Sequence, residues 1–145
     1  MPHPTTITAE PAAAVFRAHT DPGLYAQWLG PRDMQLDRLD LDARPGGQWR
    51  YDFQGHGEHA GMTFSFFGVF HMVQPNTLLV QTFEFNVAPG QVGLTSTRFE
   101  DVDGRTRLSV HEVYPSVEAR DAALASGMER GIREGYERLD ELLAR

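Results

Sequence analysis

The chain has 145 residues, a formal net charge of −7 and no cysteine, and all of its 13 basic residues are arginine. The missing thiols exclude disulfides, thiolate nucleophiles and Cys-ligated metal centres, and the acidic balance argues against nucleic acid or an anionic membrane as a partner. Hydrophobic residues make up 41% of the sequence, no apolar run approaches the roughly 20 residues of a membrane span, and residues 1–10 lack the features of a signal peptide. We therefore expect one globular domain, residues 1–145, located in the cytoplasm.

Two short helices are predicted near the N-terminus. The stretch before them, Thr5–Thr8, is long enough only for a short first strand. The helical pattern starts at Ala9 and is interrupted at Asp21 and Pro22. Because Asp21 is a typical N-cap residue and Pro22 fits a first helical position, a second helix is predicted over Pro22–Leu29.

A run of six strands follows, separated by turns rich in glycine, proline and asparagine. Alternation is clearest over Gln48–Gln54, where Trp49, Tyr51 and Phe53 share one face, so this face is expected to be buried. The short connections between strands predict an antiparallel meander. The predicted strands are Met34–Ala43, Gln48–Gln54, Met62–Val73, Thr77–Phe85, Val92–Glu100 and Thr106–Tyr114.

A single long helix is predicted from Val117 to about Ala144, with Ser116 as its N-cap. Apolar residues recur along it at spacings of three and four and form one stripe. Strands in a run followed by one long helix indicate an α+β domain in which a curved sheet wraps the final helix. The stripe consists of Leu124, Met128, Ile132, Tyr136, Leu139 and Leu143.

Four motifs occur in order along the chain and together carry a resemblance: Asp21-Pro22 to Gln27-Trp28-Leu29-Gly30-Pro31, Arg44-Pro45-Gly46-Gly47-Gln48-Trp49, Gly68-Val69-Phe70 to Pro75, and Asp103-Gly104-Arg105-Thr106-Arg107-Leu108. Their order and spacing resemble the bacterial single-domain homologues of the C-terminal domain of the heat-shock-chaperone ATPase activator, in the START-like (SRPBCC) superfamily. The resemblance covers nearly the whole chain. It implies a helix-grip fold, like that of the birch pollen allergen, with a hydrophobic cavity between the sheet and the last helix.

Three glycines, Gly127, Gly131 and Gly135, stand four residues apart in the predicted last helix. Each costs about 1 kcal/mol relative to alanine in a helix interior, so their presence needs a geometric reason. Two explanations are open. The helix packs closely against the sheet or against a second copy of the chain, or the missing side chains leave space for the floor of a ligand cavity.

Two side chains are candidate catalytic groups. Strand alternation places Glu112 on the inner face of the sheet, where a carboxylate needs a partner or a raised pKa; the alternative is that it meets solvent at the end of the sheet. His71 qualifies only if it faces the interior and not water. His56, Glu58 and His59 are close in sequence, but a hairpin turn explains them more simply than a metal site, so we predict no metal and no cofactor.

Three functions are open. The preferred one is binding of a small, largely hydrophobic molecule in the cavity, by a protein that we expect to form a homodimer. The second is an enzyme similar to cyclase or hydrolase relatives in the superfamily, with Glu112 or His71 as acid or base. The third is a chaperone-activator-like interaction module, which we expect least because the N-terminal domain of the eukaryotic activator has no counterpart here. The predicted ligand-binding residues are Trp28, Trp49, Tyr51, Phe53, Gln81, Phe83, Thr97, Phe99, Glu112, Met128, Gly131, Ile132 and Tyr136.

Overall fold

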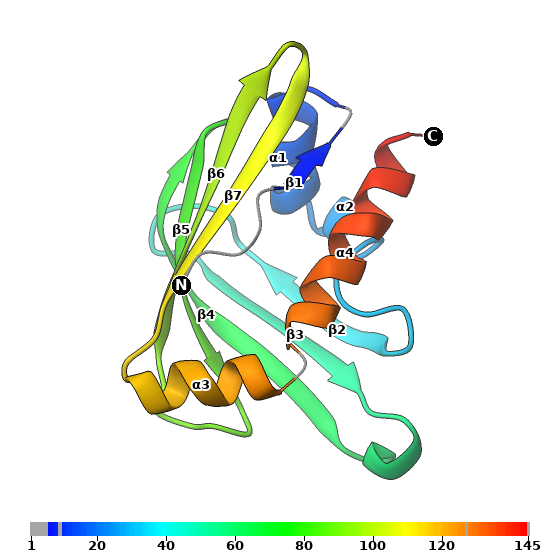
Figure 1. Cartoon of the computed structure of the whole chain (residues 1–145), viewed down its shortest axis with the longest axis vertical. Coiled ribbons are helices and arrows are strands. Elements are labelled where there is room, and N and C mark those ends of the chain that lie inside the picture. The colour runs from blue at the N-terminus through cyan, green and yellow to red at the C-terminus, as the bar shows by residue number, and fades with distance from the viewer. Residues whose placement is uncertain (1–5, 9, 127, 145) are drawn as a thin grey trace.

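Seven antiparallel strands form one curved sheet in the computed structural model, which describes residues 6–8, 10–126 and 128–144 (Figure 1). For residues 6–8 and 128 it describes the course of the backbone only. The strand order is β1-β7-β6-β5-β4-β3-β2. The strands are β1 Thr6–Thr8, β2 Gln35–Leu41, β3 Gln48–Gln54, β4 Thr63–Gln74, β5 Leu78–Phe85, β6 Gly93–Val102 and β7 Arg105–Val113.

The predicted meander of six strands is confirmed, with every strand end within two residues of its predicted position. The short stretch at the N-terminus adds β1 beside β7. Alternation in β3 also holds, because Trp49 and Phe53 are buried and Tyr51 packs against the core. Tyr51 lies opposite Phe66 of β4, so their side chains share the concave face of the sheet.

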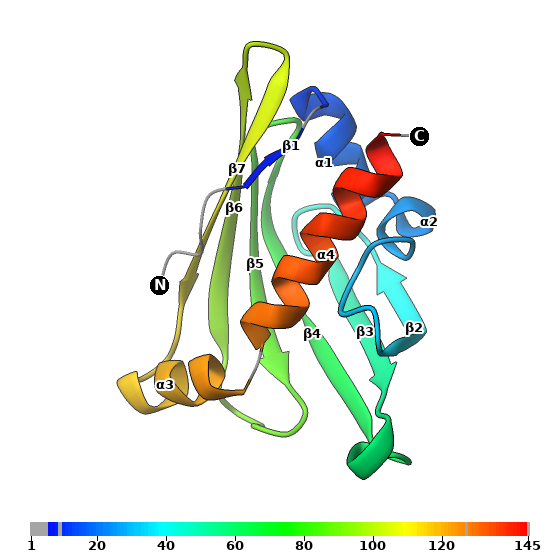
Figure 2. The same cartoon turned by 45° about the vertical axis from the view of Figure 1, so that its right-hand side comes forward.

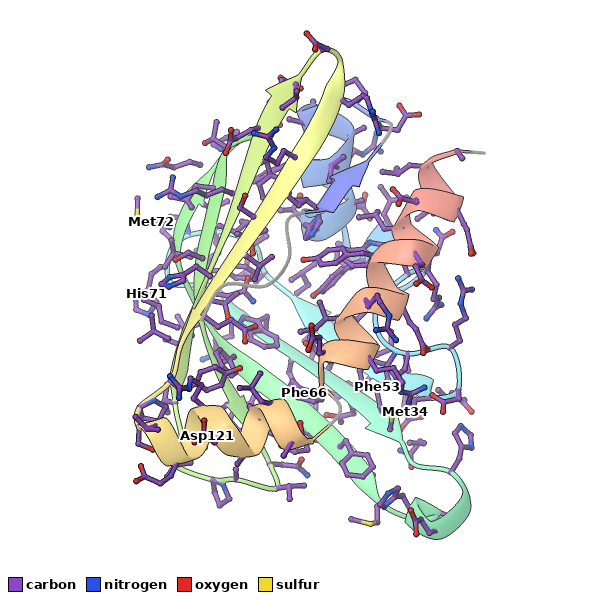
Figure 3. All side chains as sticks on the ribbon, viewed as in Figure 1. Met34, Phe53, Phe66, His71, Met72 and Asp121 are labelled. Atoms are coloured by element: carbon purple, nitrogen blue, oxygen red, sulfur yellow. The ribbon has the colours of Figure 1, made fainter. Side chains whose placement is uncertain are left out.

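A β-bulge interrupts the alternation of β4 between Phe70 and Met72. Phe70 faces the core and is 2% exposed, whereas Met72 is 42% exposed and His71 is exposed as well. After the bulge Val73 packs against the core again. Figure 3 shows His71 and Met72 on the convex side of the sheet, the side away from α4.

Two short helices precede β2: α1 (Ala12–Thr20) and α2 (Pro22–Tyr25). The predicted cap is confirmed, since the Asp21 carboxylate accepts hydrogen bonds from the backbone N–H groups of Gly23 and Leu24 at 2.9 and 3.2 Å. The second helix is shorter than predicted. The α-helix ends at Tyr25 because the chain then tightens into 3-10 turns, in which hydrogen bonds join residues three apart. One such bond runs from the N–H of Trp28 to the carbonyl of Tyr25.

The prediction of one long C-terminal helix is wrong. The segment forms two helices, α3 (Val117–Ala125) and α4 (Met128–Leu143), and Figure 2 shows them running in different directions. Ser116 caps α3 as predicted, accepting from the N–H of Ala119 at 3.0 Å. However, α3 has no buried residue, and Leu124, expected in the buried stripe, is 44% exposed. A helix without an apolar face gains little from continuing along the sheet, so only α4 lies over it.

Helix α4 crosses the concave side of the sheet and is fixed to the loop after α2 (Figure 2). The Arg138 guanidinium donates to the carbonyls of Gln27, Leu29 and Gly30 at 3.0 to 3.3 Å. No helix among the described residues is long and apolar enough to cross a membrane.

The most buried part of the interior lies at the end of the sheet that α1 covers. Leu139 of α4, Leu108 of β7 and Val15 of α1 are almost completely buried there. The opposite end of the sheet, where β3 ends and β4 begins, carries inward-facing aromatic residues that remain only half-buried. The interior is therefore packed at one end and partly open at the other.

Candidate functional site

A small cavity, here called the inner cavity, lies on the concave side of the sheet below α1 and α2. Its volume of about 20 Å³ accommodates about one water molecule. The lining comes from two helices and four strands, so residues distant in sequence meet there. The residues that line it are His19, Tyr25, Leu39, Leu41, Trp49, Tyr51, Phe70, Leu79 and Gln81.

The inner cavity differs in place and size from the one that the family resemblance implies. Three predicted ligand-binding residues, Trp49, Tyr51 and Gln81, line it, but no residue of α4 does. The short helix α2 reaches over the sheet at this point, and the rings of Trp28 and Tyr136 stack between it and α4 at a centroid distance of 5.8 Å. Trp28 and Tyr136, both predicted ligand-binding residues, therefore contact each other here and do not line the inner cavity.

The sequence analysis missed two cavity-wall residues with strongly perturbed pKa values, His19 and Tyr25. The Nδ1 of His19 donates to the carbonyl of Val15 at 2.8 Å, one turn earlier in α1. Its Nε2 is buried without a hydrogen-bond partner among the described residues. Burial lowers the pKa of His19 to about 4, although the bond to Val15 opposes this shift. The spacing of Ala12, Val15 and His19 on one helix face was the signal that could have identified it.

Three tyrosines bring hydroxyl groups into the same region. Burial raises the pKa of Tyr25 and of Tyr136 above the ordinary value. For Tyr51 the pKa is raised first by burial and then by the nearby Tyr25, Glu112 and Tyr136. All three hydroxyls therefore keep their protons near neutral pH and act as neutral donors or acceptors.

Glu112 of β7 faces the interior and is 7% exposed, so the alternative in which it meets solvent is wrong. Its carboxylate accepts a hydrogen bond of 2.6 Å from the hydroxyl of Tyr114. Burial and this bond raise the pKa of Tyr114. The charge of this carboxylate also raises the pKa of Tyr51 and of Tyr136. Glu112 therefore lies beside the group formed by Tyr25, Tyr51 and Tyr136, here called the tyrosine cluster.

Beyond the inner cavity, toward the end of the sheet near α3, four phenylalanines form what we call the aromatic surface. They are Phe64, Phe66, Phe83 and Phe85, all half-buried. Phe66 stacks on Phe85 at a centroid distance of 4.7 Å and lies 5.3 Å from Tyr51, so the surface is continuous with the cavity wall. Figure 3 shows Phe66 and Phe53 in the space between the sheet and the start of α4.

Several predicted ligand-binding residues have a packing role in the structure. Trp28 is buried and donates its indole N–H to the carbonyl of Ala18 at 3.0 Å. Phe99 is buried with its ring 5.2 Å from that of Phe16. Phe53 and Thr97 are buried too, whereas Ile132 is half-buried. The side chain of Met128 lies outside the described residues.

The glycines of the last helix contact the loop after α2 and do not line the inner cavity. A Cβ on Gly131 would lie 3.4 Å from Pro31, and one on Gly135 would lie 3.5 Å from backbone atoms of Trp28 and Gly30. The helix therefore packs closely at these two positions, but against the loop after α2, which was neither of the predicted packing partners. Gly131 was predicted to bind the ligand, and it does not line the inner cavity. Gly127 lies outside the described residues.

The remaining histidine candidates lie on the surface. His71 is exposed on the convex side of β4, so the condition under which it would be a catalytic candidate is not met. His56 and His59 are exposed in the connection between β3 and β4, which contains the 3-10 turn Gly57–His59. Within residues 6–8, 10–126 and 128–144, no three histidine or acidic side chains are grouped to hold a metal ion.

A curved antiparallel sheet closed by a C-terminal helix, with short helices after the first strand, defines the helix-grip α+β fold. Solved structures share it. A protein from Rhodobacter sphaeroides has a TM-score of 0.87 and 27% identity, over 97% of this chain and 89% of that one. A protein from Nitrosomonas europaea has a TM-score of 0.84 and 24% identity, over 99% and 93%. One from Mycobacterium smegmatis has a TM-score of 0.85 and 23% identity, over 96% and 87%.

The family model described as Activator of Hsp90 ATPase homolog 1-like protein matches residues 9–144. The chain therefore belongs to this family, as the order of its sequence motifs predicted. No curated protein matches the sequence.

Proposed function

We propose that the protein binds a small, largely apolar molecule on the concave side of its sheet. The observation that supports this most is the aromatic surface, because its four rings face the interior and still remain half-buried. Aromatic side chains that stack on one another next to a few polar groups are the usual lining of a small-molecule site.

The dimensions divide the proposed site into two parts. The inner cavity has room for about one water molecule, so it can take only the tip of a ligand. The body of the ligand would lie on the aromatic surface, against Phe66 and Phe85, where the rings offer flat apolar contact. Around the tip, the tyrosine hydroxyls and Gln81 supply the few polar contacts that fix orientation.

The test uses N-phenyl-1-naphthylamine, a neutral apolar molecule whose fluorescence rises in an apolar environment. Phe66→Ala removes a ring of the aromatic surface, and we expect the probe's Kd to rise about threefold to tenfold, the range for a lost aromatic contact. Phe67→Ala is the matched control, because Phe67 is the next residue of β4 and faces the convex side, under Arg50. Equal effects of the two substitutions, or no probe binding at all, would contradict the proposal.

Native mass spectrometry after incubation with an extract of lipids and aromatic metabolites identifies the class of ligand. A retained mass of a few hundred daltons supports binding. Conversion of an extract component into a product would instead support the enzyme alternative. In that case Glu112 and Tyr114, which are hydrogen-bonded to each other, would be the candidate acid–base pair.

A further inference from the structure

Nε2 of His19 has no hydrogen-bond partner among the described residues, and this indicates the chemical class of the ligand. The inference rests on the proposed function. A carbonyl only accepts hydrogen bonds, so the bond between Nδ1 and the Val15 carbonyl places the ring proton on Nδ1. Nε2 therefore bears a lone pair and is an acceptor. The side chain is 9% exposed, so water at the protein surface does not satisfy this acceptor.

The surroundings of His19 leave the cavity as the direction from which a donor can come. Rings of Trp28, Phe99, Tyr25 and Tyr136 lie around the imidazole at centroid distances of 4.8, 5.0, 6.3 and 6.4 Å. The nearest indole N–H, that of Trp28, is already bonded to the Ala18 carbonyl. His19 itself forms part of the cavity wall, in which the volume for one small polar group is free.

We propose that the ligand carries a hydroxyl or N–H group on an apolar frame, and that this group enters the inner cavity and donates a hydrogen bond to Nε2 of His19. The aromatic surface then holds the frame. A site with an unpaired buried acceptor discriminates strongly against an analogue that lacks the donor, because binding such an analogue leaves the acceptor unsatisfied.

The same geometry selects a neutral ligand. A carboxylate would direct its oxygen lone pairs at the lone pair of Nε2, and the buried carboxylate of Glu112 lies near the tyrosine cluster. A cation on the ligand would lose its hydration among aromatic side chains. We therefore assign the ligand to neutral alcohols, phenols or amides of mainly apolar character.

Three naphthalenes of similar size test this assignment. 1-Naphthol has a donor, 1-methoxynaphthalene has the same frame without one, and 1-naphthoate is anionic. We expect the wild-type protein to bind 1-naphthol about tenfold more tightly than 1-methoxynaphthalene, and 1-naphthoate least. His19→Phe keeps an aromatic ring and removes the acceptor, so it is expected to bind 1-naphthol and 1-methoxynaphthalene equally, with affinity for 1-methoxynaphthalene preserved.

Nitrogen NMR of the ¹⁵N-labelled protein provides a second measurement, in which ligand binding is followed on the wild-type protein itself. We expect the free protein to show a neutral Nδ1–H imidazole for His19, with its Nε2 resonance shifting upfield when 1-naphthol binds and staying in place with 1-methoxynaphthalene. The resonance is assigned by its absence from the spectrum of His19→Phe.

The outcomes separate the two proposals. Binding of 1-naphthol and 1-methoxynaphthalene with equal affinity, or an unchanged Nε2 resonance at saturation with 1-naphthol, overturns the assignment of His19 but leaves the proposed function standing. Failure of all three naphthalenes and of N-phenyl-1-naphthylamine to bind overturns both. A similar loss of affinity for 1-naphthol and 1-methoxynaphthalene in His19→Phe would show a packing role only, and it also overturns the assignment.

Discussion

His19 makes this protein less stable as the pH falls below neutral. Its pKa is about 4 in the folded state against 6.5 when unperturbed. Between these values the unfolded chain binds more protons than the folded one, so the free energy of unfolding falls as the pH falls. The contribution of His19 is fully present above pH 6.5 and is lost progressively toward pH 4.

The size of the effect follows from the same two values. Lowering the pH from 7.5 to 5.0 should cost about 2 kcal/mol of unfolding free energy through His19, and reaching pH 4 should cost about 3 kcal/mol. Tyr25 and Tyr136, the titratable groups whose rings contact His19, keep their protons throughout this range because burial raises the pKa of each.

The assay is urea unfolding at pH 7.5, 6.5, 5.5 and 5.0 for the wild-type protein and for His19→Phe. Other groups titrate alike in both proteins, so the difference between the two curves isolates His19. The wild-type protein should lose about 2 kcal/mol more than the variant between pH 7.5 and pH 5.0. Parallel curves would refute the reasoning, since they would mean that His19 is equally easy to protonate in the folded and unfolded states.

Two glycines give opposite predictions for the same Gly→Ala change. Gly131→Ala should raise the unfolding free energy by up to about 1 kcal/mol, because its Cβ would make an ordinary contact with Pro31 at 3.4 Å while the helix loses a glycine; a loss of stability in urea unfolding would contradict this. Gly68→Ala should cost about 1–3 kcal/mol, because its Cβ would lie 1.9 Å from the Thr82 carbonyl oxygen, which also accepts from the Trp49 indole. Unchanged stability and an unchanged near-ultraviolet tryptophan signal would show that β4 and β5 separate without strain.

The order of the elements could be predicted from the sequence because each strand carries its own signal. Trp49, Tyr51 and Phe53 alternate with polar residues, and turn residues punctuate each strand end, so local pattern and final fold agree. The bulge after Phe70 has no such signal. It depends on the pairing of β4 with β5, and it decides that Met72 is exposed and that Val73 packs against the core.

The break between α3 and α4 shows a second limit of periodicity. Leu124 continues the apolar stripe of the last helix in sequence, but the residues around it are charged or small, and α3 buries no side chain. Spacing alone does not reveal whether an apolar residue will find a surface to pack on. Leu139 does find one and is completely buried.

The candidate site could be predicted only in part. Inward-facing strand residues such as Gln81 and Glu112 follow from alternation, and both face the interior. The cavity wall also needs α1 and α2, whose approach to the sheet is set by packing contacts such as that of the Trp28 indole with the Ala18 carbonyl. Contacts of this kind join elements through tertiary structure, so the helical spacing that predicts a buried His19 does not show that His19 and Tyr25 meet the strands in one cavity wall.

A histidine at position 19 costs stability unless its Nε2 receives a hydrogen bond from a group in the inner cavity. Leaving a buried acceptor unsatisfied costs about 1–3 kcal/mol, and a leucine or phenylalanine among the same rings would avoid that cost. The Nδ1 bond to Val15 offsets little of it, because that carbonyl already lies within a helix that does not need the imidazole. A group that lowers stability and faces a cavity is what a binding site requires when the missing partner is supplied by a ligand. The unsatisfied nitrogen and the half-buried aromatic surface thus have one common explanation in a neutral, donor-bearing apolar ligand.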